Sequence, residues 1–304
     1  MLLTKVLAGC RIIMLSTSFQ ENELSHTQND IPRSDAHYVQ RLSVTVGLVL
    51  LGLASAPFVT LPTRPLTFEV FGSPLSLHVS ERYVFVALLV GLVCTGTDAL
   101  LRTHPSAQRR PLENTFVMWT VPALTILLAA LALPFAPNLL FWIAGILLTG
   151  LLLGVIMTAE YHTIDSRDPH FASSQLMLQT MTYVLALASF IMVYGAKSRS
   201  LLSATILFVI TALLTLERLR STGHTLSTTI FYGLTAGLVI GQSVWALNYS
   251  RVPGTVGGSL LLIAFHVVSG LATQHLSSRL TSRALIEYGI VALLGTGLSI
   301  HYLG

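Results

Sequence analysis

The stretch LLFWIAGILLTGLLLGVIMTA, residues 139–159, contains no charged side chain along its whole length. A helix needs about 20 apolar residues to cross the hydrocarbon core of a bilayer, because each residue adds about 1.5 Å along the helix axis. The apolar residues of this chain come in long blocks like this one rather than in an alternating pattern. The stretch therefore predicts a membrane-spanning helix.

The composition of the whole chain also indicates lipid as the solvent. Of its 304 residues, 53% are hydrophobic and only 10% are charged, whereas soluble domains carry roughly 25% charged residues. The basic balance, with a pI near 9.3, does not indicate a nucleic-acid partner, because the Lys and Arg residues are spread over short loops. The two cysteines, Cys10 and Cys94, form no metal-binding pattern and no disulfide framework.

Nine apolar blocks follow a polar segment. Residues 1–40 predict a disordered tail, and residues 41–304 predict an all-α, polytopic transmembrane helical bundle. Eight spans is the lower count, because the sixth block is short and the ninth ends with the chain. The expected spans are residues 42–61, 83–101, 116–135, 139–159, 175–195, 201–217, 227–248, 257–276 and 285–303.

The first loop between spans has a different pattern. LTFEV and LSLHV alternate on either side of Gly72-Ser73-Pro74. This alternation around turn-forming residues predicts a short β-hairpin over residues 66–79.

The distribution of Lys and Arg predicts the orientation of the chain. Cytoplasmic loops carry an excess of these residues, and 12 of the 17 fall on one side if the N-terminus is cytoplasmic. The C-terminus and the hairpin would then be extracytoplasmic, in a bacterial inner membrane. The twelve are Lys5, Arg11, Arg33, Arg41, Arg102, Arg109, Arg110, Arg167, Arg218, Arg220, Arg279 and Arg283.

Four carboxylates lie near the predicted inner ends of spans. Asp98 has Arg102 one turn away, and Glu287 follows Arg283 by one turn, which is the spacing of local helical ion pairs. One interpretation is interfacial anchoring of the helix ends. The other is a polar layer that binds an ion or a solute. The four are Asp98, Glu160, Glu217 and Glu287.

A polar stretch, AEYHTIDSRDPHF at residues 159–171, joins the fourth and fifth spans. Carboxylates together with imidazoles suit zinc, manganese or iron. However, no H-E-x-x-H pair occupies one helical face, and Asp168-Pro169 is common in turns. The stretch is a solvated loop, a metal or catalytic site, or a docking loop for a partner. Its candidate ligands are Glu160, His162, Asp165, Asp168 and His170.

His266, in LLIAFHVVSG, is the only histidine near a predicted bilayer midplane. A bis-histidine haem is disfavoured, because His275 is on roughly the opposite face and about 13 Å further along the axis. His266 is therefore either hydrogen-bonded to a neighbouring helix or a single axial ligand of a haem or chlorin. It is the one candidate cofactor-binding residue, and the cofactor is not determined.

Two spans contain small-residue strips. Glycines that recur every four residues form a smooth strip along which another helix can approach closely. This pattern is specific for packing and gives no indication of catalysis. The residues are Gly233, Gly237 and Gly241 in the seventh span, and Gly150 and Gly154 in the fourth.

Glutamines also occur inside the predicted spans. Gln242 lies in the seventh span, and Gln175 and Gln179 lie one turn apart at the inner start of the fifth. Each either makes an interhelical hydrogen bond or lines a polar pathway.

At TGTDALLRTHP (95–105), EYHTIDSRDPHF (160–171) and GQSVWALNY (241–249), the chain resembles uncharacterised multi-span membrane proteins of green non-sulphur bacteria (Chloroflexota). The resemblance covers most of residues 41–304. That family has no assigned activity, so the resemblance implies only an all-helical polytopic protein of a bacterial cell membrane.

Three hypotheses for function follow. The first is a non-enzymatic subunit or accessory of a larger membrane complex, with protein partners in the bilayer, because the chain has packing strips but no P-loop and no G-x-S-x-G elbow. The second is a transporter of a small solute or ion that uses the carboxylate layer. The third is a metal-dependent enzyme that uses the loop after the fourth span.

Overall fold

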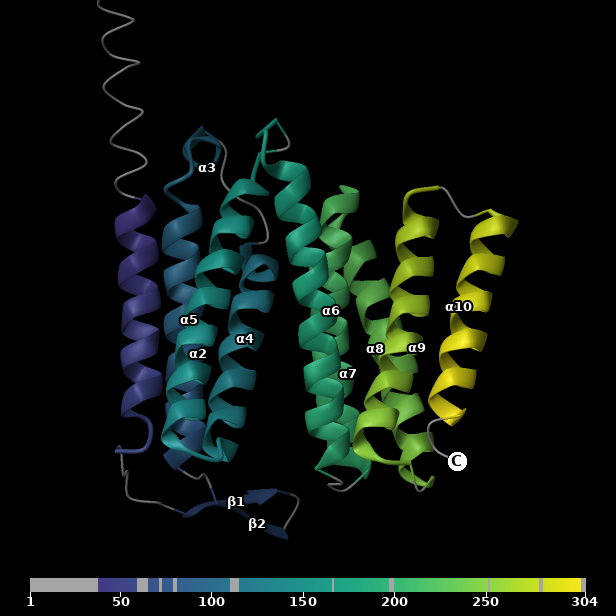
Figure 1. Cartoon of the computed structure of the whole chain (residues 1–304), viewed down its shortest axis with the longest axis horizontal. Coiled ribbons are helices and arrows are strands. Elements are labelled where there is room, and N and C mark those ends of the chain that lie inside the picture. The colour runs from purple at the N-terminus through teal and green to yellow at the C-terminus, as the bar shows by residue number, and fades with distance from the viewer. Residues whose placement is uncertain are drawn as a thin grey trace, which may run out of the picture.

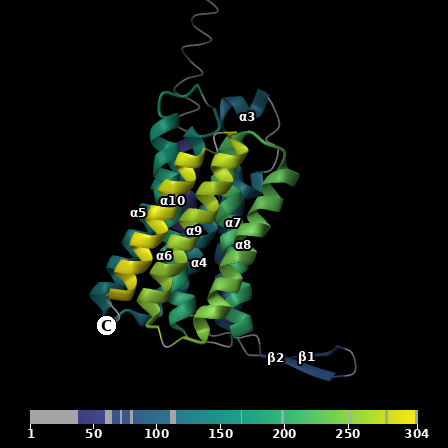
Figure 2. The same ribbon diagram turned by 90° about the vertical axis from the view of Figure 1, so that its right-hand side faces the viewer.

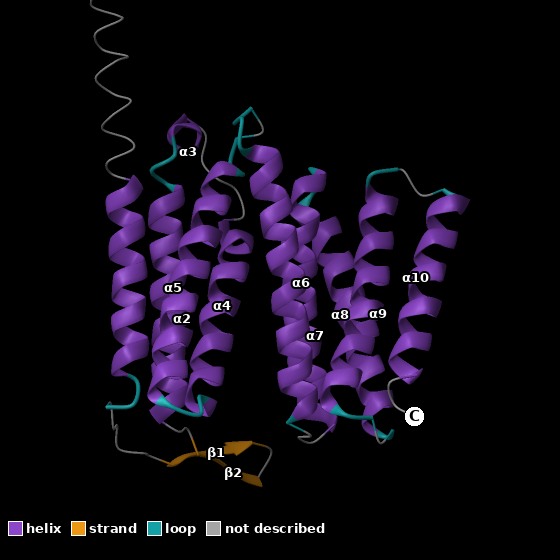
Figure 3. Cartoon of the chain, viewed as in Figure 1, coloured by secondary structure: helices purple, strands orange, loops and turns teal. Residues whose placement is uncertain are grey.

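In the described part of the chain, upright helices form a bundle, and two short strands lie beyond one end of it (Figures 1 and 3). The first helix, Tyr38–Ser55, begins inside the predicted tail, and residues 1–37 of that tail lie outside the described residues. The computed structural model describes residues 38–58, 65–70, 73–78, 81–109, 115–165, 167–196, 200–250, 252–278 and 281–301.

The later helices alternate in direction along the chain (Figure 1). We call the two ends of the bundle the α3 end and the hairpin end, after the elements found there. The helices are α2 (Glu81–Leu101), α3 (Pro105–Arg109), α4 (Thr120–Ala132), α5 (Leu139–His162), α6 (Phe171–Gly195), α7 (Ser200–Leu219), α8 (Leu226–Asn248), α9 (Gly254–Leu276) and α10 (Ser282–His301), with 3₁₀ turns η1 (Thr115–Trp119), η2 (Leu133–Phe135) and η3 (Arg220–Thr222).

Eight of the described helices are long and apolar enough to cross a membrane, as expected for a multi-pass membrane protein. The predicted count of nine is not supported, whereas the lower predicted count of eight agrees. α10 is not among the eight. It carries Arg283 and Glu287 in its first two turns.

The strands β1 (Pro65–Val70) and β2 (Ser73–His78) lie within the loop between the first helix and α2. They pair antiparallel, with Pro65 opposite His78 and Val70 opposite Ser73. Figure 2 shows that the pair projects to one side, beyond the ends of the helices.

The buried apolar residues form two clusters. One joins the first helix to α2, α4 and α5 through residues such as Val49, Val93 and Leu153. The other joins α6, α7, α8 and α9 around Phe190 and Phe265. α4 and α5 contribute residues to both clusters, so these two helices connect the two halves of the bundle.

Glycines bring α8 against the backbone of α7. A Cβ added at Gly233 would lie 3.1 Å from a carbonyl oxygen of α7, and one at Gly237 would lie 2.6 Å from another. At Gly241 the corresponding distance is 3.3 Å, so all three predicted positions lie at a close helix contact. A Cβ at Gly150 would meet Leu50 of the first helix at 2.7 Å.

The prediction is wrong for Gly154, where an added Cβ would meet nothing within 4 Å. The four-residue spacing of the strip continues there, but Gly154 borders an open hollow together with Leu42 of the first helix, so no side chain packs closely against it. Close packing that the sequence interpretation missed occurs between α6 and α9, where Gly254 approaches the backbone of Gly195 and Gly258 approaches that of Ile191.

Candidate functional site

A partly buried arginine lies between two buried carboxylates at the α3 end of the bundle. Arg220, the first residue of η3, places Nη1 2.9 Å from Glu160 Oε2. Its Nη2 lies 3.1 Å from Glu217 Oε1 and donates to Thr163 Oγ1 at 3.0 Å. The exposed fraction of the side chain is 0% for Glu160, 5% for Glu217 and 25% for Arg220. We call these three residues the buried triad.

The local backbone explains how the triad forms. η3 continues from the end of α7, so Glu217 and Arg220 lie three residues apart on one face. Gly223 ends this turn at φ 72°, a left-handed conformation that glycine adopts readily. Glu160 comes from the last turn of α5, and Thr163 caps that helix. One guanidinium therefore ties α5 to α7.

The triad leaves polar atoms without partners. Glu160 Oε1 and Glu217 Oε2 are buried and have no hydrogen bond within the described part of the chain. Burial lowers the pKa of Arg220, but the two carboxylates outweigh burial and raise it. Two carboxyl groups share one guanidinium, so one of them has no counter-ion within the triad. Buried polar atoms without a hydrogen-bond partner are uncommon in folded proteins.

A cavity of about 330 Å³ adjoins the triad. It lies among the ends of α5 and α7, η3, and the flanks of α6 and α9. The two glutamines predicted to start the fifth span border it, and neither amide is hydrogen-bonded to a described residue. The polar residues of the wall are Thr163, Gln175, Gln179, Thr182, Glu217, Arg218, Arg220 and Thr273.

A chain of contacts leads from this wall toward His266. Arg218 donates to the Tyr183 hydroxyl, and its Cζ lies 4.9 Å from the centre of the Tyr183 ring. The same hydroxyl lies 2.8 Å from His266 Nδ1, and the ring of Tyr288 in α10 lies 5.5 Å from the imidazole. His266 is thus hydrogen-bonded to a neighbouring helix. Its role as a haem or chlorin ligand stays a prediction.

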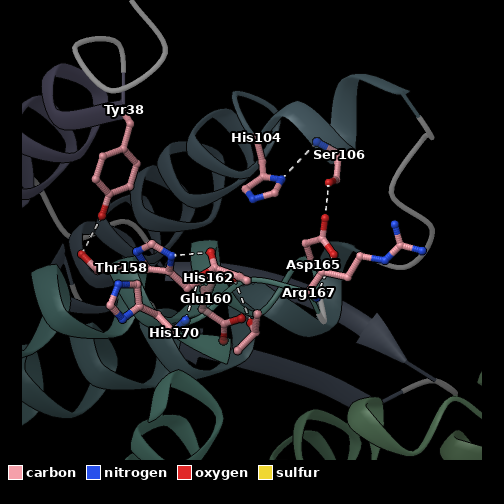
Figure 4. A network of polar contacts seen from close by, with 11 residues as sticks. Tyr38, His104, Ser106, Thr158, Glu160, His162, Asp165, Arg167 and His170 are labelled. Atoms are coloured by element: carbon pink, nitrogen blue, oxygen red, sulfur yellow. Dashed lines mark hydrogen bonds and ion pairs between the residues drawn. The ribbon is translucent and has the colours of Figure 1, made fainter. Parts of the chain in front are cut away.

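The loop between α5 and α6 is held by its own polar contacts (Figure 4). His162 Nδ1 lies 2.8 Å from Asp168 Oδ2, and Asp168 Oδ1 accepts the backbone N–H of His170 at 2.8 Å. Asp165 instead accepts the Ser106 hydroxyl at 2.8 Å. Polar contacts therefore hold the loop both through its own residues and against α3.

The predicted metal ligands are not gathered around one point. Across the described ranges, no group of three or more His, Cys, Asp or Glu side chains could hold a metal ion. Glu160 is bound to Arg220, Asp165 points to Ser106, and His162 is paired with Asp168. The arrangement gives the metal interpretation no support.

Hydrogen bonds fix the charges of this loop. The backbone N–H of Arg167 and the Ser106 hydroxyl lower the pKa of Asp165. Partial burial raises the pKa of Asp168, but the hydrogen bonds from His162 and His170 outweigh it and lower the pKa. Both carboxylates are therefore ionised at neutral pH.

Residues 61–301 match a family of proteins of unknown function, DUF5656. This chain belongs to DUF5656. The match includes the buried triad and the cavity wall but not the first helix. No curated protein and no solved structure matches the chain. The absence of an assigned activity agrees with the resemblance noted from the sequence, while the bacterial group stays a prediction.

The structure separates the four predicted carboxylates of this DUF5656 chain into two kinds. Asp98 lies 2.6 Å from Arg102, and Glu287 lies 3.2 Å from Arg283 with 65% of its side chain exposed. These two local pairs fit the anchoring interpretation. The other two carboxylates belong to the buried triad, so the four do not form one continuous layer.

Arg220 is the residue of this DUF5656 chain that the sequence interpretation missed. The Lys and Arg pattern treats it as a topology signal only. The segment LERLRS, residues 216–221, does place Glu217 and Arg220 at helical spacing. Its pairing with Glu160, 60 residues away, has no signal in a single sequence.

Proposed function

We propose that this DUF5656 protein is a membrane transporter that binds a small polar solute in the cavity beside the buried triad. The observation that carries the proposal is the pair of buried carboxyl groups around one guanidinium, next to a cavity with polar walls. Ionisable residues within membrane segments are costly to bury, and they commonly mark substrate or ion pathways.

The cost of burial supports a functional role for the triad. Moving charges out of water costs several kcal/mol for each ion, and an apolar replacement of a buried ion pair is often as stable. Stability alone therefore does not account for Glu160 and Glu217. A group that binds the excess carboxylate from the cavity does account for them.

We also propose the orientation of the chain. The α3 end would face the cytoplasm, because it carries the loops that the Lys and Arg pattern predicts to be cytoplasmic. α10 lies beside α9 at the same level of the bundle (Figure 1) and would complete a ninth crossing, which places the C-terminus outside. Reporter fusions after residues 109 and 196 test this orientation. A reporter fused after residue 109 should lie in the cytoplasm, and one fused after residue 196 should lie outside.

Uptake into liposomes that contain the purified full chain tests transport. The probes are radiolabelled methylammonium, glycine, acetate and glycerol. Glu217→Gln removes the carboxylate that borders the cavity, and Glu287→Gln is the matched control, because Glu287 is exposed and outside the cavity wall. We expect uptake of at least one probe, lost at least tenfold in Glu217→Gln and kept in Glu287→Gln. Liposomes with the protein that take up no probe faster than empty ones would overturn the proposal.

A second candidate, a subunit of a larger membrane complex, is favoured by a different feature. An apolar groove of about 730 Å³ opens at the hairpin end and is bordered by Phe58, Phe85 and Trp142. Exposed apolar concavities suit a partner helix or lipid. The mass and composition of the particle extracted gently from its native membrane test this candidate, since a fixed stoichiometry of other proteins would support it and a lone chain would exclude it.

A further inference from the structure

We propose that the group received by the cavity is a protonated primary amine, carried either by a simple amine or by a zwitterion. The inference rests on the proposed solute-binding function and names the chemistry of the same cavity.

The first argument is an unused acceptor. Glu217 borders the cavity, only 5% of its side chain is exposed, and Oε2 has no partner in the described part of the chain. Its other oxygen lies 3.1 Å from Arg220. A buried carboxylate oxygen can only be satisfied by a donor, and Glu217 supplies the carboxylate among the described residues that border the cavity.

The second argument concerns the hydroxyl groups of the wall. Thr182 donates to the carbonyl oxygen of Leu178 at 2.9 Å, and Thr273 donates to that of Ser269 at 2.8 Å. Each hydroxyl has one proton and two lone pairs. Because both protons are already used within the helices, these hydroxyls present acceptors to the cavity.

The third argument is the number of acceptors in the wall, which is sufficient for an ammonium group. An ammonium group has three N–H donors and no acceptor. The wall offers the Glu217 carboxylate, the Thr182 and Thr273 hydroxyls, and the amide oxygens of Gln175 and Gln179. Hydrogen bonds between an ionised donor and a carboxylate are about twice as strong as neutral ones. The wall therefore suits a small cationic donor.

The local charges disfavour an anion. Arg220 already serves two carboxylates, and Arg218 donates to the Tyr183 hydroxyl and lies over its ring. An anion that approached these guanidinium groups would also approach Glu217. An ammonium group would instead meet the Glu217 carboxylate of the wall.

Thermal unfolding of the purified full chain at pH 7 tests the proposal, with methylammonium, glycine, acetate and glycerol as probes at equal ionic strength. We expect methylammonium, glycine or both to raise Tm, and acetate and glycerol to leave it unchanged. A shift with methylammonium identifies a simple amine as sufficient, and a shift with glycine alone identifies a zwitterion. Either result supports the inference, because the shared group is the amine.

Two variants separate binding from folding. Glu217→Gln should weaken amine binding roughly 10- to 100-fold, as expected for the loss of a hydrogen bond to a charged group. Thr273→Val keeps the shape of the wall but removes one acceptor, and it should weaken binding roughly 2- to 10-fold even if Glu217→Gln does not fold. Glu287→Gln should bind as the parent does.

Three results would overturn the amine assignment. They are an equal shift with acetate, amine binding unchanged in both cavity variants, and no shift with either amine. The uptake experiment tests the transporter proposal separately from the amine assignment. Glu217-dependent uptake of glycerol or acetate would keep the transporter proposal while rejecting the amine, whereas the absence of all protein-dependent uptake would reject both.

Discussion

Glu160 at the end of α5 and Arg220 in η3 are 60 residues apart in the chain, yet their charged groups meet at 2.9 Å. Glu160 is fully buried. This contact joins α5, which belongs to both apolar clusters, to the end of α7. At the α3 end of the bundle, one guanidinium therefore joins these two helices.

Removal of Arg220 should destabilise the protein strongly. Arg220→Met leaves two buried carboxyl groups without a cation, and the loss of one partner of a buried pair costs about 3–5 kcal/mol. The free energy of unfolding in detergent measures this effect. The triple variant Glu160→Gln, Glu217→Gln, Arg220→Met should recover much of the loss, and a triple variant no more stable than Arg220→Met would contradict the charge explanation.

Substitution of Gly237 should weaken the contact between α7 and α8. A Cβ at Gly237 would lie 2.6 Å from the Phe208 carbonyl oxygen, so Gly237→Ala forces the helices apart at a cost of about 1–3 kcal/mol. Gly154→Ala is the matched control in another span, because its Cβ meets open space. It should be neutral or more stable by up to about 1 kcal/mol, since alanine favours helix. Equal losses in both variants would refute the packing account.

Acidification should destabilise the α3 end through His104. Burial lowers the pKa of His104, and this effect outweighs the opposing charges of Asp165 and Asp168. Its Nδ1 accepts the Ser106 backbone N–H at 3.1 Å, which requires the unprotonated nitrogen. The unfolded chain therefore binds the proton more readily, and stability is lost as pH falls below about 6.5 toward the folded pKa.

The slope of Tm against pH between 7.5 and 5 measures this contribution. His104→Asn, which does not titrate in this range, should show a smaller slope than the parent. The lowered pKa values of Asp165 and Asp168 act at lower pH. They add stability that is present above about pH 3.9 and is lost only as the pH falls below that value. An unchanged slope in the variant would exclude His104 as the source.

Loss of the Ser106 hydroxyl should release α3 from the loop after α5. Ser106→Ala removes the hydrogen bond to Asp165, which is worth about 0.5–1.5 kcal/mol. Amide hydrogen exchange should become faster in residues 105–109 and 163–170 and stay unchanged in α8. Ser250→Ala is the control, because that hydroxyl bonds only within its own turn. Unchanged exchange in α3 would show that other contacts hold it.

Much of the fold can be predicted from the sequence, because lipid imposes a length and a composition on every span. The uncharged block at residues 139–159 marks α5 closely, and the glycines of α8 mark a real helix contact. Local ion pairs such as Asp98 with Arg102 are also predictable, since helical spacing is visible in the chain.

The candidate site is less predictable. Helical spacing indicates which residues share a face but not which helix that face meets, so it includes Gly154 wrongly and gives no partner for Glu160. The four carboxylates look equivalent in the sequence. Only tertiary packing distinguishes exposed Glu287 from buried Glu217.

The glycine contact between α6 and α9 has a mechanical consequence. Near the hairpin end these two helices meet backbone to backbone, at Gly195 and Gly254. Toward the α3 end the cavity lies between them, bordered by Thr182 and Thr273. Backbones in contact leave no room for one helix to slide inward past the other. The two helices therefore cannot approach each other more closely at Gly195 and Gly254, and a change in the width of the cavity requires a change in the angle between them.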